Sequence, residues 1–344
     1  MQIDGRVIEP YTDAYIIAEI GSTHNGEFER AKKSIDAAAA AGADAVKFQL
    51  FRADEMYTDA VDQEVYDHVV KIEVPYDWIP ELAAHAEEQD VTFLTTPFDT
   101  ESVDELDPYV PAFKVGSSSL SHVEFMQHLA GTGKPILAST GAQDLDDVRD
   151  ARDTLTTAGC SEFAFLHCVS AYPTPLEDIN VRAVATLREE FGDPVGFSDH
   201  TLDPGTAPTA AVALGASIVE KHFTLDRSQD GPDHSHSLEP DEFETMVDAI
   251  RATERALGTG AVTITDIERD WYEDARRSVQ ATRDLSAGET ITSDDVGVHR
   301  SVGKRRGVDA KQIDTVLGAT LVEPVAEGDG ITEDLIERDG ELSD

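Results

Sequence analysis

The stretch YIIAEIGSTHNGEFERAKKSIDAAAAAGADAVKFQLF (residues 15–51) predicts a strand, a helix and a second strand in succession. Its two ends, 15–21 and 44–51, are short apolar runs of the kind that form buried parallel strands. Between them, residues 28–43 have a helical pattern that ends near Gly42. The turn after the first run lacks the GxGxxG spacing of a dinucleotide-binding, doubly wound sheet. This unit therefore favours a barrel over an open sheet.

The same alternation of apolar run and helical pattern continues along the chain. Six further apolar runs follow, at residues 91–98, 112–117, 135–140, 162–170, 195–200 and 217–223. Eight strand–helix units in about 240 residues predict an α/β fold, a (β/α)₈ TIM barrel. We assign residues 1–257 to this catalytic domain, with residues 1–14 as an N-terminal extension.

A second, smaller domain is predicted after the barrel. Residues 258–275 lose the alternating pattern and are assigned to a linker, and residues 276–344 to the second domain. Within it, segments 284–296 and 324–336 repeat a glycine, an isoleucine, a threonine and an aspartate at positions 40 residues apart. Each copy predicts a glycine turn followed by a short strand and a capped turn, so we expect a small β-rich domain.

Composition and charge exclude several classes of partner. The 344 residues include 69 Asp and Glu against 27 Lys and Arg, a formal charge of −42. Such a charge disfavours nucleic acid and anionic membranes as partners. No apolar run approaches the roughly 20 residues of a membrane span. The two cysteines, Cys160 and Cys168, show no CxxC spacing, and a reducing cytoplasm is the expected compartment.

The distribution of charge also predicts a habitat. Acidic residues are spread along the whole chain, and only nine of its residues are lysines. At molar salt the Debye length falls to about 3 Å, which screens the self-repulsion of such a surface. We expect a halophilic protein from a salt-accumulating organism; an ordinary acidic mesophilic protein is the alternative.

Polar side chains gather at the ends of the predicted strands. In a TIM barrel the reactive residues lie at the carboxyl ends of the strands. We therefore expect an active-site mouth formed from Glu19, Lys47, Gln49, Thr95, Thr96, Lys114, Ser117, Ser139, Thr140, His167, Ser198, Asp199, His200, Glu220 and His222.

Three lysines lie inside apolar runs of a chain that is otherwise poor in lysine. Burial of an ammonium group costs several kcal/mol unless an anion lies beside it. Lys47 and Lys114 therefore predict an anionic ligand, with a structural ion pair to Glu19 or Glu220 as the alternative. The period-2 pleat places Lys221 on the opposite face from its neighbour, so we expect it to point outward to the helices.

Two histidines end adjacent predicted strands. His200 and His222 could share one divalent metal ion and leave positions open for substrate oxygen. A lone strand-end histidine usually serves only as a hydrogen-bonding residue, which is the alternative for each. The tract GPDHSHSL (231–238) is interpreted as a loop over the mouth, with Asp233 expected to contact substrate in preference to metal.

Several motifs together resemble the sialic acid synthase family, in order and at family spacing over nearly all of residues 15–338. They include TTPFDTESVDEL (95–106), FKVGSSSL (113–120), LHCVSAYPTPLEDIN (166–180), GFSDHT (196–201) and EKHFT (220–224). The segment RRSVQATRDLSAGETITSDDV (276–296) resembles the antifreeze-like SAF domain of that family. The resemblance implies condensation of phosphoenolpyruvate (PEP) with an N-acetylated amino sugar to a nine-carbon keto acid. The sugar would be N-acetylmannosamine or a 2,4-diacetamido-6-deoxyhexose.

The resemblance also implies roles for individual residues. The PEP-binding positions would be Lys47, Thr96, Lys114, Ser117, Ser139 and Ser198. His200 and His222 match the metal ligands, usually for Mn²⁺, and Glu19 is the candidate to activate water. The family positions that face the sugar are occupied here by Glu19, Gln49, Tyr172 and Asp233. Arg300 matches an arginine that reaches the sugar from the partner subunit of a domain-swapped homodimer. The chain departs from the family pattern at Ser119, where an acid is common, at Ser170, where some members have Asn, and at Ser301 and Val302.

Two other functions compete with this one. A class I aldolase would form a Schiff base through a lysine, typically on the sixth strand, but the run FAFLHCVS (163–170) contains none. A barrel that binds a sugar without turning it over is the second alternative, and the departures at Ser119 and Ser301 are compatible with it.

Overall fold

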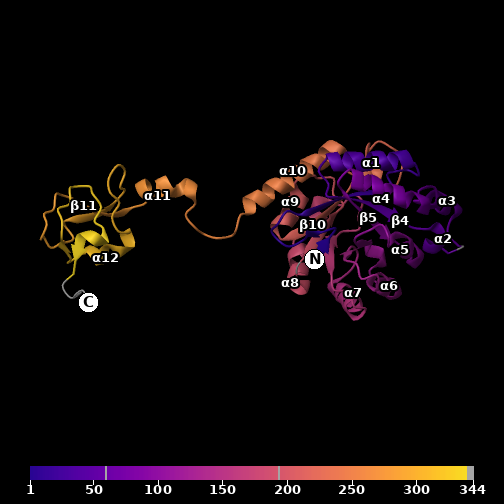
Figure 1. Cartoon of the computed structure of the whole chain (residues 1–344), viewed down its shortest axis with the longest axis horizontal. Helices are drawn as coiled ribbons and strands as arrows, with labels where there is room; N and C mark the ends of the chain where they lie inside the picture. Colours follow the sequence, from indigo (N-terminus) through magenta and orange to yellow (C-terminus); the bar gives the residue numbers. More distant parts are fainter. Residues whose placement is uncertain (59, 193, 339–344) are drawn as a thin grey trace. The chain divides into compact units, whose positions relative to one another are not determined.

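The computed structural model describes residues 1–58, 60–192 and 194–338. The chain divides into two compact units, Met1–Thr259 and Gly260–Asp344, which are shown in Figure 1. In the described part of the chain, no helix is long and apolar enough to cross a membrane.

The first unit is a closed barrel of parallel strands, as the alternating pattern predicts. Its strand order runs from β3 through β9 to β10, and β10 pairs with β3 to close the ring. The described strands are β3 (Tyr15–Gly21), β4 (Ala45–Leu50), β5 (Thr92–Pro97), β6 (Phe113–Val115), β7 (Ile136–Ser139), β8 (Phe163–Cys168), β9 (Val195–Asp199) and β10 (Ala216–His222).

Helices follow each strand and cover the outside of the barrel (Figure 1). Their buried faces pack against outward-pointing strand residues such as Phe48, Phe113 and Phe197 in one continuous apolar layer. The helices are α1 (Phe28–Ala40), α4 (Ile79–Glu88), α5 (Thr100–Leu106), α6 (Val123–Gly131), α7 (Leu145–Thr157), α8 (Ala183–Phe191), α9 (Thr206–Ala213) and α10 (Pro240–Leu257). The loop after β4 also carries two short helices, α2 (Ala53–Met56) and α3 (Gln63–Lys71).

A second apolar cluster fills the interior of the barrel toward the amino-terminal ends of its strands. Strand residues such as Ile17 and Leu94 meet there, and Ile3 and Ile8 of the N-terminal segment join them. Strands β1 (Gln2–Ile3) and β2 (Arg6–Val7) form an antiparallel pair. Residues 1–14, predicted as an extension, therefore contribute apolar side chains to the barrel. Toward the carboxyl ends of the strands, the interior of the barrel is polar.

The second unit has its own small core. Strand β11 (Ser278–Ala281) pairs with β12 (Val296–His299), and β13 (Thr320–Leu321) pairs with β14 (Ile336–Glu337). The sequence repeat appears as two matching turns, in which Gly288 and Gly328 both adopt positive φ values, 86° and 83°. The four-residue helix α12 (Ile313–Val316) lies between the two turns in sequence.

The predicted linker contains regular structure. Helix α11 (Arg269–Ala275) lies within residues 258–275, where no helix was predicted. The end of the predicted second domain, residues 339–344, lies outside the described residues.

Candidate active site

A cavity of about 290 Å³ opens at the carboxyl ends of the barrel strands. Eleven of the thirteen residues predicted for the site line it: Glu19, Lys47, Gln49, Thr96, Lys114, Ser117, Ser139, Tyr172, Ser198, His200 and His222. Strand order explains this meeting, because each of the eight strands or the loop that follows it contributes at least one of these side chains.

Lys47 is held by residues from the two neighbouring strands. Glu19 of β3 lies beside Lys47 of β4 in the strand register. The Nζ of Lys47 lies 2.7 Å from Glu19 Oε2, and it donates a hydrogen bond of 2.7 Å to Thr96 Oγ1 of β5. The Lys47 side chain is 3% exposed. A buried ammonium therefore stands at the floor of the cavity with both partners fixed.

Lys114 is held in a similar way on the other side of the cavity. Its Nζ donates to Ser139 Oγ at 2.6 Å and lies 3.6 Å from Glu220 Oε1. The same Glu220 oxygen lies 3.7 Å from Lys47 Nζ. The ion pairs with Glu19 and Glu220, which the sequence left as the alternative to an anionic ligand, are thus present in the structure.

Burial and charge act in opposite directions on these four groups. Burial raises the pKa of Glu19 above its usual value, although Lys47 opposes this effect. Burial also disfavours ionised Glu220, but Lys114 and Lys47 outweigh it, and the pKa of Glu220 is lowered. Burial lowers the pKa of Lys114. Of the two carboxylates, Glu19 therefore takes up a proton more readily than Glu220.

His200 and His222 lie together at the mouth, with ring centroids 5.3 Å apart. His200 Nδ1 lies 2.8 Å from the carbonyl oxygen of Val169, an arrangement in which Nδ1 carries the proton and Nε2 keeps a free lone pair. His222 Nδ1 is buried with no hydrogen-bond partner among the described residues. Burial lowers the pKa of His200 to about 4 and that of His222 well below the usual value. Both rings are neutral near pH 7, as metal ligands must be.

The donor set fits a divalent transition-metal ion. Ligand atoms of His222, Asp233 and His236 lie within 4.8 Å of one another, next to His200. Asp233 does not line the cavity; its Oδ2 accepts hydrogen bonds from the Ser22 amide at 2.8 Å and the Ser22 hydroxyl at 2.6 Å.

Two predicted sugar-facing residues lie at the mouth. The Tyr172 ring stands 4.2 Å from the His200 ring, centroid to centroid, and its side chain remains 53% exposed. Gln49 Nε2 donates to Glu19 Oε1 at 2.7 Å, so it orients the carboxylate. Arg300 belongs to the second unit, where its guanidinium lies 5.9 Å from the Trp271 ring centroid.

Some cavity residues escaped the sequence analysis. They include Met56, Phe98, Gly116, Ser118 and Cys168; Ser170, which the sequence analysis noted only as a departure from the family pattern, also lines the cavity. Gly141 supports the same wall, because a Cβ there would lie 2.4 Å from Ser170 Oγ and 2.8 Å from Ser117 Oγ. A signal for Ser118 was the run of three serines, from which the sequence analysis singled out Ser119; Ser118 lines the cavity and Ser119 does not.

Lys221, Asp199 and His167 do not line the cavity, so the expectation that Asp199 and His167 form its mouth was wrong. Lys221 pairs with Asp199 at 2.7 Å on the outer face of the barrel, as the strand pleat predicts. His167 Nε2 lies 2.7 Å from the carbonyl oxygen of Ile179, and the ring stacks on Phe197. Each has partners that account for its burial.

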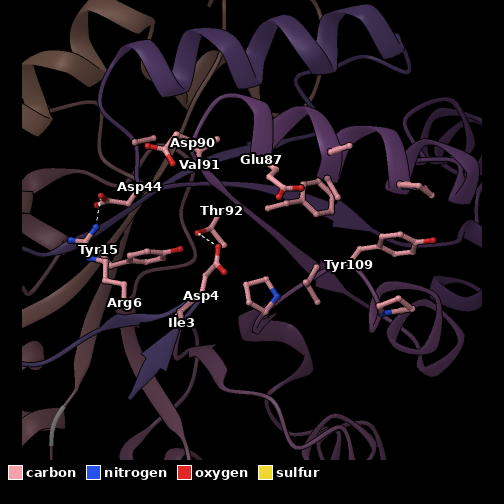
Figure 2. A pocket seen from close by; sticks show the side chains of 18 residues that line it. Ile3, Asp4, Arg6, Tyr15, Asp44, Glu87, Asp90, Val91, Thr92 and Tyr109 are labelled. Carbon is pink, nitrogen blue, oxygen red and sulfur yellow. Dashed lines mark hydrogen bonds and ion pairs between the residues drawn. The ribbon is translucent and has the colours of Figure 1, made fainter.

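A larger cavity of about 830 Å³ lies at the opposite end of the barrel (Figure 2). Two pairs of its polar residues bond one another: Arg6 pairs with Asp44, and Thr92 donates to Asp4 at 3.4 Å. These residues precede or begin their strands, the end of a TIM barrel associated with stability and not with catalysis.

The chain is similar to known proteins over nearly its whole length. Residues 34–262 match the NeuB family, and residues 276–337 match the SAF domain. The chain is 36% identical to the N,N'-diacetyllegionaminic acid synthase of Legionella pneumophila, over 89% of this chain and 90% of the relative. It is 33% identical to the human N-acetylneuraminate-9-phosphate synthase, over 98% of this chain and 96% of the relative. The crystal structure of the Bacillus subtilis spore coat polysaccharide biosynthesis protein SpsE aligns with a TM-score of 0.69 and 36% identity. The alignment covers 100% of this chain and 99% of the SpsE chain.

Proposed function

The chain belongs to the NeuB family and is a synthase of the sialic acid type, and we propose that it condenses PEP with an N-acetylated amino sugar. The product is a nine-carbon keto acid, and phosphate is released. The observation that carries this proposal is the pair of buried lysines, Lys47 and Lys114, in one cavity lined by hydroxyl groups. Buried ammonium groups surrounded by hydroxyl donors suit a small, highly charged anion.

PEP carries about three negative charges at neutral pH, from its phosphate and its carboxylate. Lys47 and Lys114 supply the cations, and hydroxyl groups of Thr96, Ser139 and Ser198 stand within the same cavity. Ser117 adds a fourth hydroxyl; its Oγ accepts a hydrogen bond of 2.9 Å from the Gly141 amide, which leaves its proton free to donate. These groups hold PEP electrostatically, and neither lysine acts as a nucleophile.

His200 and His222 would hold a divalent ion, most consistent with Mn²⁺. A bound ion of this kind supplies Lewis-acid polarisation of the aldehyde oxygen of the open-chain sugar. Val169 fixes the tautomer of His200, and Tyr172 covers the imidazole face. The two histidines thus set where the sugar carbonyl lies relative to PEP.

The carbon–carbon bond forms between C3 of PEP and the carbonyl carbon of the sugar. Positive charge develops at C2, and a water molecule adds there and loses one proton, while the former aldehyde oxygen of the sugar takes up one proton and becomes a hydroxyl group. We assign the transfer of the water proton to Glu19; the raised pKa that results from its burial and the orientation of its carboxylate by Gln49 support this role. The tetrahedral intermediate then expels phosphate by cleavage of the C2–O bond, and the remaining hydroxyl proton at C2 leaves with the phosphate.

The sugar side of the site extends from Gln49 and Tyr172 toward Asp233. We infer that Arg300 completes it from the second subunit of a domain-swapped homodimer, and that the enzyme works in the cytoplasm of a halophilic organism. The sugar is N-acetylmannosamine or a 2,4-diacetamido-6-deoxyhexose; the similarity to a legionaminic acid synthase supports the second.

Phosphate release from PEP over a panel of these sugars tests the proposal. Release must require both PEP and one of the sugars, and a chelator must abolish it. Borohydride reduction in the presence of pyruvate would trap the lysine adduct of a Schiff-base aldolase, which is not expected here. Sugar binding without phosphate release would identify a non-catalytic sugar-binding barrel.

A further inference from the structure

The loop GPDHSHSL (231–238) carries two histidines that face different surroundings. Both belong to the short 3-10 turn η4 (His234–His236). His234 Nδ1 lies 2.7 Å from Thr224 Oγ1, and His234 lines a separate pocket with Thr224 and Asp226; its Nε2 is also buried without a partner among the described residues. The His236 ring lies 4.8 Å from the His222 ring and 5.0 Å from the Tyr172 ring, centroid to centroid. Only the second histidine therefore joins the imidazole cluster at the mouth.

His236 is buried in a way that ordinary packing does not explain. The residue is 4% exposed, and its Nε2 has no hydrogen-bond partner among the described residues. His222 Nδ1 is buried and unpartnered in the same cluster. A buried polar atom without a partner costs about 1–3 kcal/mol. Two such nitrogens in one cluster call for a group that both can bind.

A carboxylate stands beside the two rings. Asp233 Oδ1 lies 3.7 Å from His236 Nε2, and the other oxygen of Asp233 is anchored by Ser22. The ligand atoms of His222, Asp233 and His236 lie within 4.8 Å of one another. This combination of converging imidazole nitrogens and adjacent negative charge suits a divalent transition-metal ion.

We propose that His236 is a third imidazole ligand of the divalent ion held by His200 and His222. The proposal rests on the metal centre of the proposed function and adds one protein ligand to it. Asp233 contributes its charge next to the ion. Three imidazoles favour transition metals such as Mn²⁺ and Co²⁺ over Mg²⁺, which prefers oxygen ligands. The site therefore selects its metal through the loop as well as through the strands.

Metal binding to the full chain, without substrates, tests this role. Mn²⁺ affinity is measured by competition with a chelator, and Co²⁺ binding by its visible absorption spectrum. His236→Gln and His236→Asn are expected to weaken Mn²⁺ binding at least about tenfold, since even partners behind the ligands contribute 10- to 100-fold. Both substitutions are also expected to change the Co²⁺ spectrum. Mg²⁺ is expected to displace Mn²⁺ more readily from these variants than from the parent.

His234→Gln is the matched control, because it changes a histidine in the same turn that faces Thr224. It is expected to leave Mn²⁺ affinity and the Co²⁺ spectrum unchanged. The proposal is overturned if both His236 variants bind Mn²⁺ and Co²⁺ as the parent does. It is equally overturned if His234→Gln weakens binding as much as His236→Gln, because the effect would then come from the fold of the loop.

His200→Ala and His222→Ala separate this proposal from the one it rests on. If these two variants lose Mn²⁺ while the His236 variants keep it, only the third ligand is wrong. If all of them bind Mn²⁺ normally, the metal centre itself is wrong.

Discussion

The ammonium group of Lys47 lies 2.7 Å from Glu19 Oε2, in the interior of the barrel. Together with the pairing of Lys114 and Glu220, this makes the charged side chains that line the described cavity two lysines and two glutamates. PEP must therefore bind in a cavity where the charges of the two glutamates nearly balance those of the two lysines. Its phosphate and carboxylate are expected to take over part of the hydrogen bonding that Thr96 and Ser139 now provide to the lysines.

Each of the two lysines is expected to be necessary for PEP affinity. Lys47→Gln and Lys114→Gln remove one charge-assisted hydrogen bond each, worth about 1.5–3 kcal/mol, so Kd for PEP should rise about tenfold or more. Isothermal titration calorimetry of PEP without sugar measures this change. Lys33→Gln, an exposed lysine of α1, is the control and should leave Kd unchanged. Normal PEP affinity in both cavity variants would remove the lysines from the PEP site.

Lys221 is expected to serve the fold and not the reaction. Its ion pair with Asp199 is fully buried, with both side chains 0% exposed. Lys221→Met leaves a buried carboxylate unpaired, which should lower the free energy of unfolding by about 3–5 kcal/mol. The double variant Asp199→Asn with Lys221→Met should recover much of that loss. Arg149→Met, which removes two exposed ion pairs, with Asp146 and Glu190, should change stability far less. Chemical denaturation measures all three; a stable Lys221→Met variant would contradict the assignment.

His24 should make stability depend on pH. Burial lowers its pKa to about 4, and the Gly26 amide donates to its Nδ1 at 3.0 Å, which requires an unprotonated nitrogen. The unfolded chain, with a pKa near 6.5, binds more protons between pH 6.5 and 4, so the free energy of unfolding falls as pH falls. The His24 contribution lost between pH 7 and pH 5 should be about 2 kcal/mol.

The comparison of the parent with His24→Gln isolates this contribution from that of the many carboxylates. The loss of unfolding free energy between pH 7 and pH 5 should be smaller in the variant than in the parent. Parallel pH profiles for the two proteins would show that His24 titrates normally in the folded state.

Salt should increase both activity and stability. At a net charge of −42, self-repulsion is screened within about 10 Å at 0.1 M salt and about 3 Å at 1 M. Activity and the midpoint of thermal unfolding are therefore expected to rise from dilute buffer to molar KCl. Maximal activity at or below about 0.1 M salt would exclude adaptation to high salt.

The barrel could be predicted from the sequence because its strands are buried on both faces. Each apolar run coincides with an observed strand to within about two residues at either end. The N-terminal hairpin escaped prediction because two-residue strands have too short an alternation to detect. Helices α2 and α3 escaped because they are short and mostly exposed.

The candidate site was predicted to the extent that strand ends define it. The position of Lys47 and Lys114 within apolar runs predicted their burial, and the strand pleat predicted that Lys221 points outward. The central position of Glu220 between the two lysines depends on distances across the barrel, which no local pattern contains. His236 lies beside His222 and His234 lies beside Thr224 because of the conformation of the loop. From the sequence alone, the two histidines of this tract could not be told apart.

The fate of the bridging oxygen of PEP tests the central claim most directly. PEP is labelled with ¹⁸O at the oxygen that joins C2 to phosphorus, and it is turned over with the sugar that supports phosphate release. The account predicts that the label leaves in phosphate, because the C2–O bond breaks, and that solvent oxygen enters the keto acid. Label retained in the keto acid, or no consumption of PEP with any sugar of the panel, would contradict it.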